Sequence, residues 1–301
     1  MTLNYHTPIL INQILDSLII DPKGTYIDAT FGGGGHSRAL LNRLEKQGKI
    51  LAFDQDEEAI QNNIVQDHRL ELFHQNFRHL EKILRFKGIS KVSGILADLG
   101  VSSHQLDTAE RGFSIRFDHD IDMRMNKKAK QSAQTIINTY SEEKLDRIFS
   151  EFGELKNSRK LAKAIVVKTR EKPIETTFEL IKSIENEFDY KKIKFLARVF
   201  QALRMEVNGE IKALKQLLIS IRSILKKGGH VAIISYHSLE DRLVKQFFKN
   251  GRFDKTPEED FYGKKLLPFL VLSNKPIFPD DEEIRKNPRA KSARLRVAEK
   301  I

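Results

Sequence analysis

Apolar and polar positions alternate along the first hundred residues in a way that predicts strands and helices in turn. Four short apolar runs suit buried strands, and they lie at Thr25–Thr30, Lys49–Phe53, Leu70–Phe73 and Val92–Ala97. Between the first two, residues 37–45 carry leucines at helical spacing, with a serine at or near the helix start. This alternation predicts an α/β fold with a parallel sheet covered by helices on both faces.

The pattern changes after the fourth predicted strand. From about residue 106 to residue 207 the strand signal disappears, and three segments, at 141–153, 158–170 and 176–188, have helical spacing instead. We therefore predict that residues 106–207 form an inserted, all-helical domain.

The sheet is expected to resume after this insertion. Residues 211–229 predict a helix that stops at Gly228–Gly229, and a buried strand follows at His230–Ser235. We expect irregular connections from 252 to 288 and a last strand near Leu295–Val297. Residues 1–105 and 208–301 then form one sheet domain.

A run of glycines follows the first predicted strand. Gly32–Gly35 lies between a strand and a helix, where the backbone is open to a ligand and free helix N–H groups can meet an anion. Asp54 follows Gly34 by 20 residues and ends the next strand, where a carboxylate accepts hydrogen bonds from ribose hydroxyls. A structural turn is the alternative, and the pairing with Asp54 favours a nucleoside ligand.

The residues after the glycines narrow the choice of nucleoside. The phosphate-binding loop of ATP and GTP proteins has a lysine followed by serine or threonine after its last glycine, and here His36 and Ser37 occupy these positions. The missing lysine disfavours ATP and GTP as ligands. Ser37 also replaces the third glycine of the dinucleotide fingerprint, so NAD is second choice. S-adenosylmethionine has ribose hydroxyls and no pyrophosphate, and it suits the loop best.

Composition limits the remaining chemistry. The chain has 301 residues, 40% of them hydrophobic and 31% charged, as in globular proteins. Its net charge of +11 favours a polyanionic partner, although a basic protein without such a partner would look alike. It has no cysteine, which excludes thiolate metal sites and sulfur nucleophiles. No leader or membrane-spanning stretch is evident, so we expect a soluble, cytoplasmic protein without a membrane partner.

Seven ordered blocks resemble one family over nearly the whole chain, the bacterial small-subunit ribosomal RNA (cytosine-N4)-methyltransferases. The blocks are YHTPIL at Tyr5–Leu10, DATFGGGGHS at Asp28–Ser37, ADLGVSS at Ala97–Ser103, QLDTAERGFS at Gln105–Ser114, FQALRMEVNGE at Phe200–Glu210, ISYHSLEDRLVK at Ile234–Lys245 and NPRAKSARLRVAEK at Asn287–Lys300.

The resemblance implies a class I, Rossmann-like methyltransferase sheet with a helical insertion that helps to bind substrate. It implies S-adenosylmethionine as cofactor and a cytidine in the decoding centre as target, within a partly or fully assembled small subunit. The residues that it assigns to the cofactor are Gly34, Gly35, His36, Asp54 for the ribose, Phe77 for the adenine, Asp98 and Gln105. The sequence does not specify an oligomeric state.

One block departs from the family pattern. A glycine-proline-leucine step is replaced here by His119, Asp120 and Ile121, and Asn126 closes the block in place of an aspartate. Losing a Gly-Pro turn changes local backbone preferences, whereas Asp122, Met123, Arg124 and Met125 still match the family block.

Candidate catalytic residues follow two of the predicted strands. Methylation of cytosine at ring carbon 5 requires a cysteine nucleophile, so the absence of cysteine excludes it and leaves methylation of the exocyclic amino group. Asp98 and Ser102 follow the fourth strand and could accept the amino hydrogen bonds. In the later block, Tyr236 could stack on an extruded base and His237 could bind it, or both could cap and pack on the next helix. His6 has no second ligand at metal spacing, so we expect no metal.

Positive charge is concentrated in two segments that could contact RNA phosphates. Residues 156–172 carry seven basic residues against one acid, and residues 285–296 carry six against none. A solvated surface is the alternative for either segment. Arg111, Arg124 and Arg204 could bind substrate, or they could tie the insertion to its parent domain through acidic partners.

Together with the resemblance, these observations predict a methyltransferase that uses S-adenosylmethionine and acts on the N4 amino group of a cytidine in small-subunit ribosomal RNA. Three alternatives are an RNA-binding assembly factor without catalysis, a DNA N4-cytosine methyltransferase and a nicotinamide-dependent dehydrogenase. The incomplete dinucleotide fingerprint and the basic segments disfavour the last.

Overall fold

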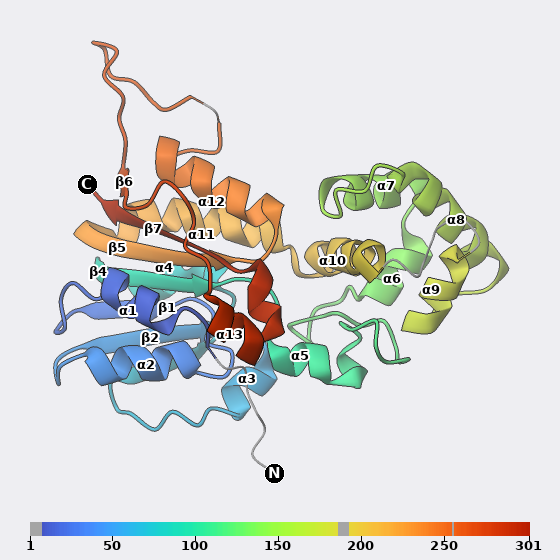
Figure 1. Cartoon of the computed structure of the whole chain (residues 1–301), viewed down its shortest axis with the longest axis horizontal. Coiled ribbons are helices and arrows are strands. Elements are labelled where there is room, and N and C mark those ends of the chain that lie inside the picture. Colours follow the sequence, from blue (N-terminus) through green and yellow to red (C-terminus); the bar gives the residue numbers. More distant parts are fainter. Residues whose placement is uncertain (1–7, 186–192, 255) are drawn as a thin grey trace. The chain divides into compact units, whose positions relative to one another are not determined.

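The computed structural model describes residues 8–185, 193–254 and 256–301. The chain divides into two compact units, Met1–Gly100 with Ile211–Ile301, and Val101–Glu210. Each unit is described by itself (Figure 1). The second unit extends a few residues beyond the predicted insertion at 106–207 on both sides.

A seven-stranded sheet forms the centre of the first unit, in the order β3-β2-β1-β4-β5-β7-β6. Neighbouring strands from β3 to β5 are parallel, whereas β7 runs antiparallel to both β5 and β6. The strands are β1 Thr25–Asp28, β2 Lys49–Asp54, β3 Leu70–His74, β4 Val92–Asp98, β5 Leu225–Ser235, β6 Phe269–Val271 and β7 Arg294–Lys300. The Rossmann-like α/β sheet expected from the sequence is confirmed, with an antiparallel edge that the sequence did not reveal.

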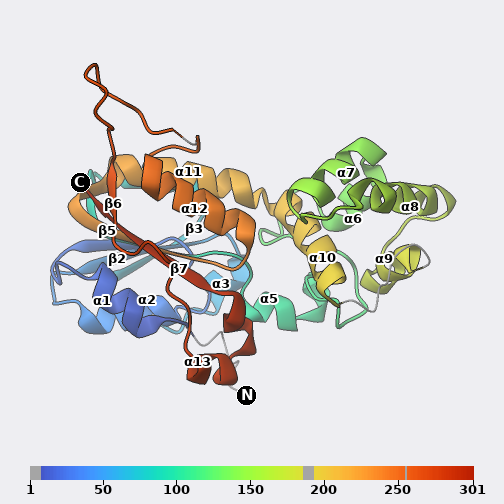
Figure 2. The same cartoon turned by 45° about the horizontal axis from the view of Figure 1, so that its top comes forward.

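Helices cover both faces of this sheet, as Figures 1 and 2 show. Helices α1 and α2 share one apolar core with one face, and α4, α11 and α12 share a second core with the other. Strands buried on both sides explain the near-continuous apolar runs, as in β4. The helices are α1 Ile11–Leu18, α2 Gly35–Arg43, α3 Glu57–Gln61, α4 Leu80–Phe86, α11 Glu210–Ile224, α12 Ser238–Asn250 and α13 Asp281–Lys286, with short 3-10 turns η1 Phe77–His79 and η3 Pro288–Ser292.

The strand order reverses between β1 and β4, because the chain proceeds from β1 to β2 and β3 on one side and from β4 to β5 on the other. Ligands of open α/β sheets bind outside the carboxyl ends of the strands at such a reversal. Asp28, Asp54 and Asp98 are the last residues of β1, β2 and β4. The topology therefore brings three aspartates to the edge where a ligand is expected.

Two details of the sheet domain differ from the sequence prediction. The predicted glycine stop is wrong, since α11 ends at Ile224 and Gly228–Gly229 lie inside β5. The register there passes from Val92↔Leu225 to Gly94↔His230, and Gly228 with φ 72° accommodates the extra residues as a bulge. The connection predicted as irregular also contains β6 and α13.

The second unit consists of helices around an apolar core of its own. Phe149, Leu161 and Leu203 are fully buried in it. Serine and threonine caps begin several of its helices, for example Ser141 before α7 and Thr176 before α9. The elements are α5 Ser103–Asp107, η2 Ala109–Arg111, α6 Ala133–Thr139, α7 Glu142–Glu151, α8 Ser158–Glu171, α9 Thr177–Ile184 and α10 Ile193–Asn208. The end of the predicted helix at 176–188 lies partly outside the described residues.

Across the described ranges, we find no helix with the length and apolar character needed to cross a membrane.

We expect Phe149→Ala to lower the free energy of unfolding by about 3–5 kcal/mol, because it leaves a cavity in the core of the second unit. The side chain of Phe149 is 0% exposed, whereas Phe178 is 47% exposed. Phe178→Ala is therefore the matched control and should cost about 1 kcal/mol or less. Urea unfolding followed by circular dichroism measures both, and equal losses would contradict this view of the core.

Candidate functional site

The glycine turn between β1 and α2 is open at one position. A Cβ added at Gly32, where φ is 53°, would meet nothing within 4 Å. At Gly34 an added Cβ would lie 2.7 Å from the Phe31 ring, and at Gly35 it would lie 2.8 Å from Pro8. Packing within the protein therefore excludes side chains at Gly34 and Gly35. The Gly34 N–H already donates to the carbonyl of Phe31 at 2.8 Å. A ligand would therefore meet the N–H groups of Gly35 and His36 in the first turn of α2, which have no intrahelical acceptors.

Asp54 is tied to this turn by its carboxylate. Oδ2 accepts a hydrogen bond from the Gly32 N–H at 2.7 Å, and Oδ1 accepts one from the Asp56 N–H at 2.8 Å. Burial raises the pKa of Asp54 to about 6, against the effect of these two hydrogen bonds. Each oxygen keeps a second lone pair for an external hydroxyl donor.

Asp98 is held between an aromatic hydroxyl and an imidazole. Tyr236, which follows β5, donates its hydroxyl to Asp98 Oδ1 at 2.9 Å. His36 Nδ1 lies 3.9 Å from Asp98 Oδ2. Burial, with the nearby Asp98 carboxylate, raises the pKa of Tyr236 well above its usual value, so the hydroxyl remains a donor. The structure therefore brings together three of the residues predicted from the sequence.

Asp28 is a member of this cluster that the sequence analysis did not single out. Its side chain is fully buried, and it accepts hydrogen bonds from the Ser37 hydroxyl at 2.7 Å and from the Thr30 N–H at 3.1 Å. Burial raises its pKa, and the nearby Asp98 acts in the same direction. The available signal was positional, because an aspartate ends three of the parallel strands. Ser37 thus binds Asp28 from within α2 instead of capping the helix.

Phe77 lies beyond the end of β3, in η1. It is partly buried against the core on the α4 side of the sheet. The neighbouring Asn76 donates its amide to Gln55 at 2.6 Å, which joins the residues after β2 and β3. This places an aromatic ring at the same sheet edge as Asp54. Tyr5 and His6 lie outside the described residues.

Other predicted residues have capping roles in the structure. The Nδ1 atom of His237 accepts from the Glu240 N–H at the start of α12, as the capping alternative proposed. In the second unit, Ser102 and Gln105 form a reciprocal capping box at the start of α5. Helix capping therefore explains in part why polar residues occupy these three positions.

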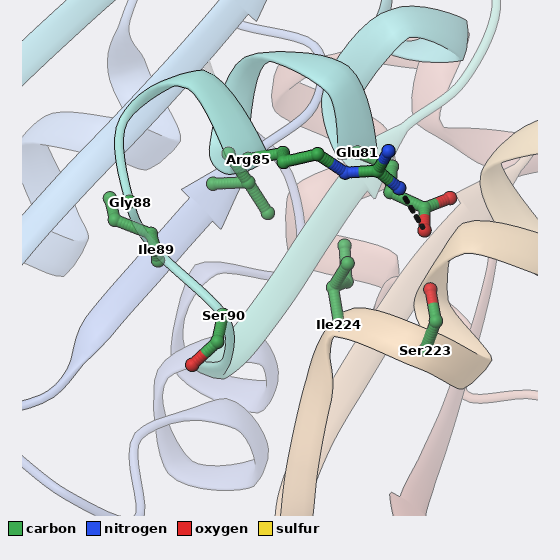
Figure 3. Close-up of a pocket in the computed structure, with 8 residues that line it drawn as sticks. Glu81, Arg85, Gly88, Ile89, Ser90, Ser223 and Ile224 are labelled. Atoms are coloured by element: carbon green, nitrogen blue, oxygen red, sulfur yellow. Dashed lines mark ion pairs between the residues drawn. The ribbon is translucent and has the colours of Figure 1, made fainter.

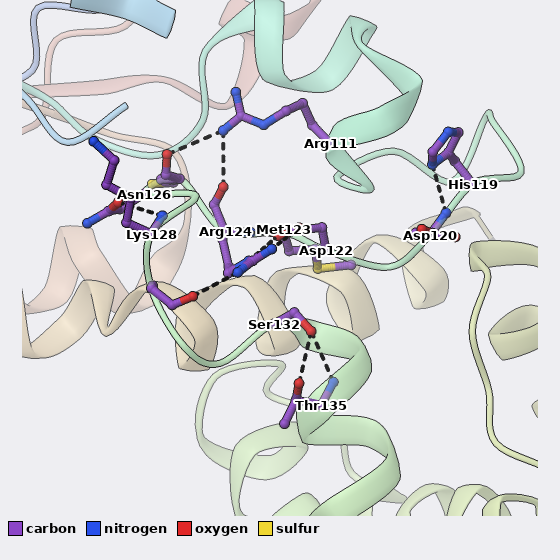
Figure 4. Close-up of polar contacts among 12 residues, drawn as sticks. Arg111, His119, Asp120, Asp122, Met123, Arg124, Asn126, Lys128, Ser132 and Thr135 are labelled. Atoms are coloured by element: carbon purple, nitrogen blue, oxygen red, sulfur yellow. Dashed lines mark hydrogen bonds and ion pairs between the residues drawn. The ribbon is translucent and has the colours of Figure 1, made fainter. Parts of the chain in front are cut away.

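The three predicted substrate arginines have partners within the second unit, drawn in part in Figure 4. Arg111 is buried and donates to the backbone carbonyls of Arg124 and Met125 at 3.0 and 3.3 Å. Arg124 pairs with Asp122 through two nitrogens, and Arg204 pairs with Glu210 in the same manner. The contacts named here lie within the second unit and so differ from the predicted tie to the parent domain, and those of Arg111 go to carbonyl groups in place of carboxylates.

The departing block 118–126 is held by long-range contacts in place of a Gly-Pro turn. Ile121 N–H donates to the carbonyl of Glu175, and Met123, with φ 58°, donates to the carbonyl of Arg111. Asn208 on α10 binds the backbone of both Met123 and Met125. The second unit therefore specifies the path of this loop without the turn.

The two basic segments differ in how far their side chains are exposed. On α8, Lys160, Lys163 and Lys168 are all exposed, and Lys168 also pairs with Glu171 at 3.1 Å. In the C-terminal segment, Arg296 is buried and binds Asp241 through two nitrogens at 2.6 and 3.2 Å. The exposed face of α8 is the better candidate for binding an external anion.

A separate pocket of about 360 Å³ lies between the end of α4 and the end of α11, with Arg85 and Glu81 on its wall (Figure 3). Ile224 immediately precedes β5 and Ser90 lies two residues before β4, so the pocket lies at the amino ends of these strands, away from the aspartates. None of the residues predicted to be functional lines it.

The three aspartates provide the test of which cofactor fits. Carboxylates at the ends of adjacent strands favour a cationic group and repel a pyrophosphate. Asp54 beside the open position at Gly32 suits a ribose. The residues present thus fit a positively charged nucleoside such as S-adenosylmethionine better than NAD or ATP.

Comparison with known proteins extends over the whole chain. A model of the MraW methylase family matches residues 4–301. A protein of Flavobacterium johnsoniae named ribosomal RNA small subunit methyltransferase H is 52% identical over 302 residues, covering 100% of this chain and 99% of that protein. Proteins of the same name are 51% identical in Bacteroides thetaiotaomicron, over 99% of this chain and 98% of theirs, and 50% identical in Christiangramia forsetii, over 99% of both.

We expect Asp54→Asn to become more stable relative to the wild type as pH rises from 4 to 7.5. The pKa of Asp54 is raised on folding, from 3.8 to about 6, so its protonated form favours the folded state. That contribution is complete below pH 3.8 and is lost as pH rises through about 6, and the asparagine variant cannot lose it. The difference in unfolding free energy should shift by about 1–3 kcal/mol. Melting curves at both pH values measure this difference, and a difference that does not depend on pH would contradict the raised pKa of Asp54.

Proposed function

The chain belongs to the MraW methylase family, and we propose that it transfers a methyl group from S-adenosylmethionine to the N4 amino group of a cytidine in the decoding centre of small-subunit ribosomal RNA. The names of its relatives support the class of RNA. The observation that carries the proposal is the set of aspartates at the strand reversal, with Asp54 bound to the open glycine turn.

The cofactor's parts match the residues around this turn. Asp54 would accept from the ribose hydroxyls, and Phe77 would contact the adenine. Beside Gly34, the N–H groups of Gly35 and His36 in the first turn of α2 would offer backbone donors, and Asp98 would contact the remaining edge of the cofactor. When bound, the cofactor supplies an electrophilic sulfonium methyl group. The three carboxylates favour its positive charge.

Asp98 is the residue best suited to bind the amino group that is methylated. The lone pair of a cytosine amino group is delocalised into the ring, so an acceptor must align its N–H groups and take up the positive charge that develops. The Tyr236 hydroxyl donates to Asp98 Oδ1, and this fixes the plane of the carboxylate. Ser102 and His237 are further candidates for contacts with the base, and the ring of Tyr236 could stack on it.

The chain's composition supports amino methylation over ring methylation. Methylation at carbon 5 of cytosine needs a cysteine that adds to the ring, and the chain has none. Transfer to an amino group is a direct displacement in which the N–C bond forms as the S–C bond breaks, a neutral thioether leaves and the amino group loses one proton. It needs no covalent intermediate on the protein. The reaction then depends on alignment more than on a nucleophile.

Asp98→Asn should lower kcat by about a hundredfold or more, because an amide is a poor acceptor for a developing cation. Its affinity for S-adenosylmethionine should change less than its turnover. Methyl transfer from a labelled donor to small subunits measures the first, and calorimetry measures the second. A fully active variant would contradict the role of Asp98.

The choice of substrate separates this proposal from its alternatives. We expect the purified protein to methylate small subunits at one cytidine, located by mass mapping of the RNA, and to leave duplex DNA unmodified. Methylation of DNA alone would favour a DNA N4-cytosine methyltransferase. Cofactor binding without transfer to any of these substrates would favour an assembly factor.

Replacing Lys160, Lys163 and Lys168 of α8 together by alanine should flatten the dependence of RNA affinity on salt. Each lost phosphate contact reduces the slope of log K against log salt by about 0.7–0.9. The matched control replaces Lys82, Lys245 and Lys249, which are exposed and lie outside both basic segments. Equal slopes for the two triple variants would show that α8 is not an RNA-binding face.

A further inference from the structure

Residues Pro8, Ile9 and Leu10 form a short strap beside the glycine turn. Leu10 has φ 54° and ψ 31°, a left-handed conformation that is unfavourable for a leucine. Ile9 and Leu10 are nevertheless almost completely buried, each at 1% exposure. Such a conformation persists only where surrounding contacts determine it.

Two contacts join the strap to the predicted cofactor loop. Pro8 packs against Gly35 so closely that a Cβ on the glycine would lie 2.8 Å from the proline ring. The carbonyl of Ile9 accepts a hydrogen bond from His36 Nε2 at 2.9 Å. Because a carbonyl can only accept, Nε2 carries the proton, and the orientation of the ring is fixed.

The other ring nitrogen of His36 lies near the carboxylate of Asp98, the candidate catalytic residue. With Nε2 bound to Ile9, Nδ1 faces Asp98 Oδ2 at 3.9 Å. A displacement of the strap would therefore move His36 and change the surroundings of Asp98. It would also release the packing on Gly35, at the start of α2.

The strap is fastened by a residue from the far end of the chain. The backbone N–H of Leu10 donates to Oε1 of Glu283 at 2.6 Å, across 273 positions of sequence. Glu283 lies on α13, whose start is capped by Asp280 accepting from the Glu283 N–H at 2.8 Å. A carboxylate also suits the N-terminal end of α1, where the helix dipole is positive.

We propose that Glu283 is a positioning residue for the cofactor site, which acts by holding the strap Pro8–Leu10 against the glycine turn and His36. This role of Glu283 rests on the proposed function, because it assumes that the site binds S-adenosylmethionine. Glu283 reaches Asp98 through Leu10, Ile9 and His36, so its effect extends to turnover as well as to cofactor affinity. The C-terminal helix α13 thereby becomes part of the methyltransferase site.

Three variants of the full-length protein separate this role from general stability. Glu283→Ala removes the acceptor, whereas Glu283→Gln keeps an amide oxygen that can accept from Leu10. Glu282→Ala is the matched control, because Glu282 is the preceding residue of α13 and pairs with Lys286 at the surface. Each variant is assayed well below its melting temperature. Glu283→Asp, which shortens the side chain by one methylene, replaces the alanine variant if that variant does not fold.

Calorimetry with S-adenosylmethionine and turnover at saturating cofactor give the first readout. We expect Glu283→Ala to weaken cofactor binding by about tenfold and to lower kcat, since the Leu10 N–H loses its partly buried acceptor. Glu283→Gln and Glu282→Ala should stay within about twofold of the wild type. Wild-type affinity and turnover in Glu283→Ala would overturn the proposal, as would equal losses in the alanine and glutamine variants.

Hydrogen exchange of the peptide that covers the strap and α1 gives a second readout without any ligand. Exchange should accelerate in Glu283→Ala and remain unchanged in Glu282→Ala. If the wild-type protein fails to bind S-adenosylmethionine, the proposed function fails, and this comparison still decides whether Glu283 holds the strap. Unchanged exchange in Glu283→Ala would overturn the fastening contact itself.

Discussion

The fold depends on a constraint of parallel sheets, which place the carboxyl ends of neighbouring strands along one edge. Here that edge carries Asp28, Asp54 and Asp98 on both sides of the strand reversal between β1 and β4. Like charges at this spacing oppose one another, and burial opposes each of them. The raised pKa values of Asp28 and Asp54 record this cost.

Hydrogen bonds from the protein make the arrangement tolerable. Gly32 and Asp56 donate to Asp54, Ser37 and Thr30 donate to Asp28, and Tyr236 donates to Asp98. A cation at this edge would neutralise the remaining charge, so the site is complementary to a positively charged nucleoside. The negative charge of the aspartates therefore destabilises the folded protein and would also favour binding of a cationic cofactor. Stability sacrificed at a ligand site is a common pattern in enzymes.

Much of this could be predicted from the sequence, because local signals decide it. The strands β1 to β4 are apolar runs bounded by turn residues, and Asp54 and Asp98 end two of them. What escaped prediction depends on distant partners. In the sequence Gly228–Gly229 resembles the end of a helix, and only the pairing of β5 with β4 shows that the two glycines lie in a strand with an irregular register. Glu283 resembles an ordinary surface residue, and only the fold shows its hydrogen bond with Leu10. The arginines 111, 124 and 204 matched family blocks, yet their internal acceptors are visible only in the folded unit.

The central claim is that the aspartates around the glycine turn hold S-adenosylmethionine. The most direct measurement is a crystal structure of the protein with this cofactor. The account predicts that the ribose hydroxyls lie within hydrogen-bonding distance of the Asp54 carboxylate, with the sulfonium on the Asp98 side of the turn. A cofactor bound elsewhere, for example in the pocket between α4 and α11, with Asp54 bonded only to protein, would contradict it.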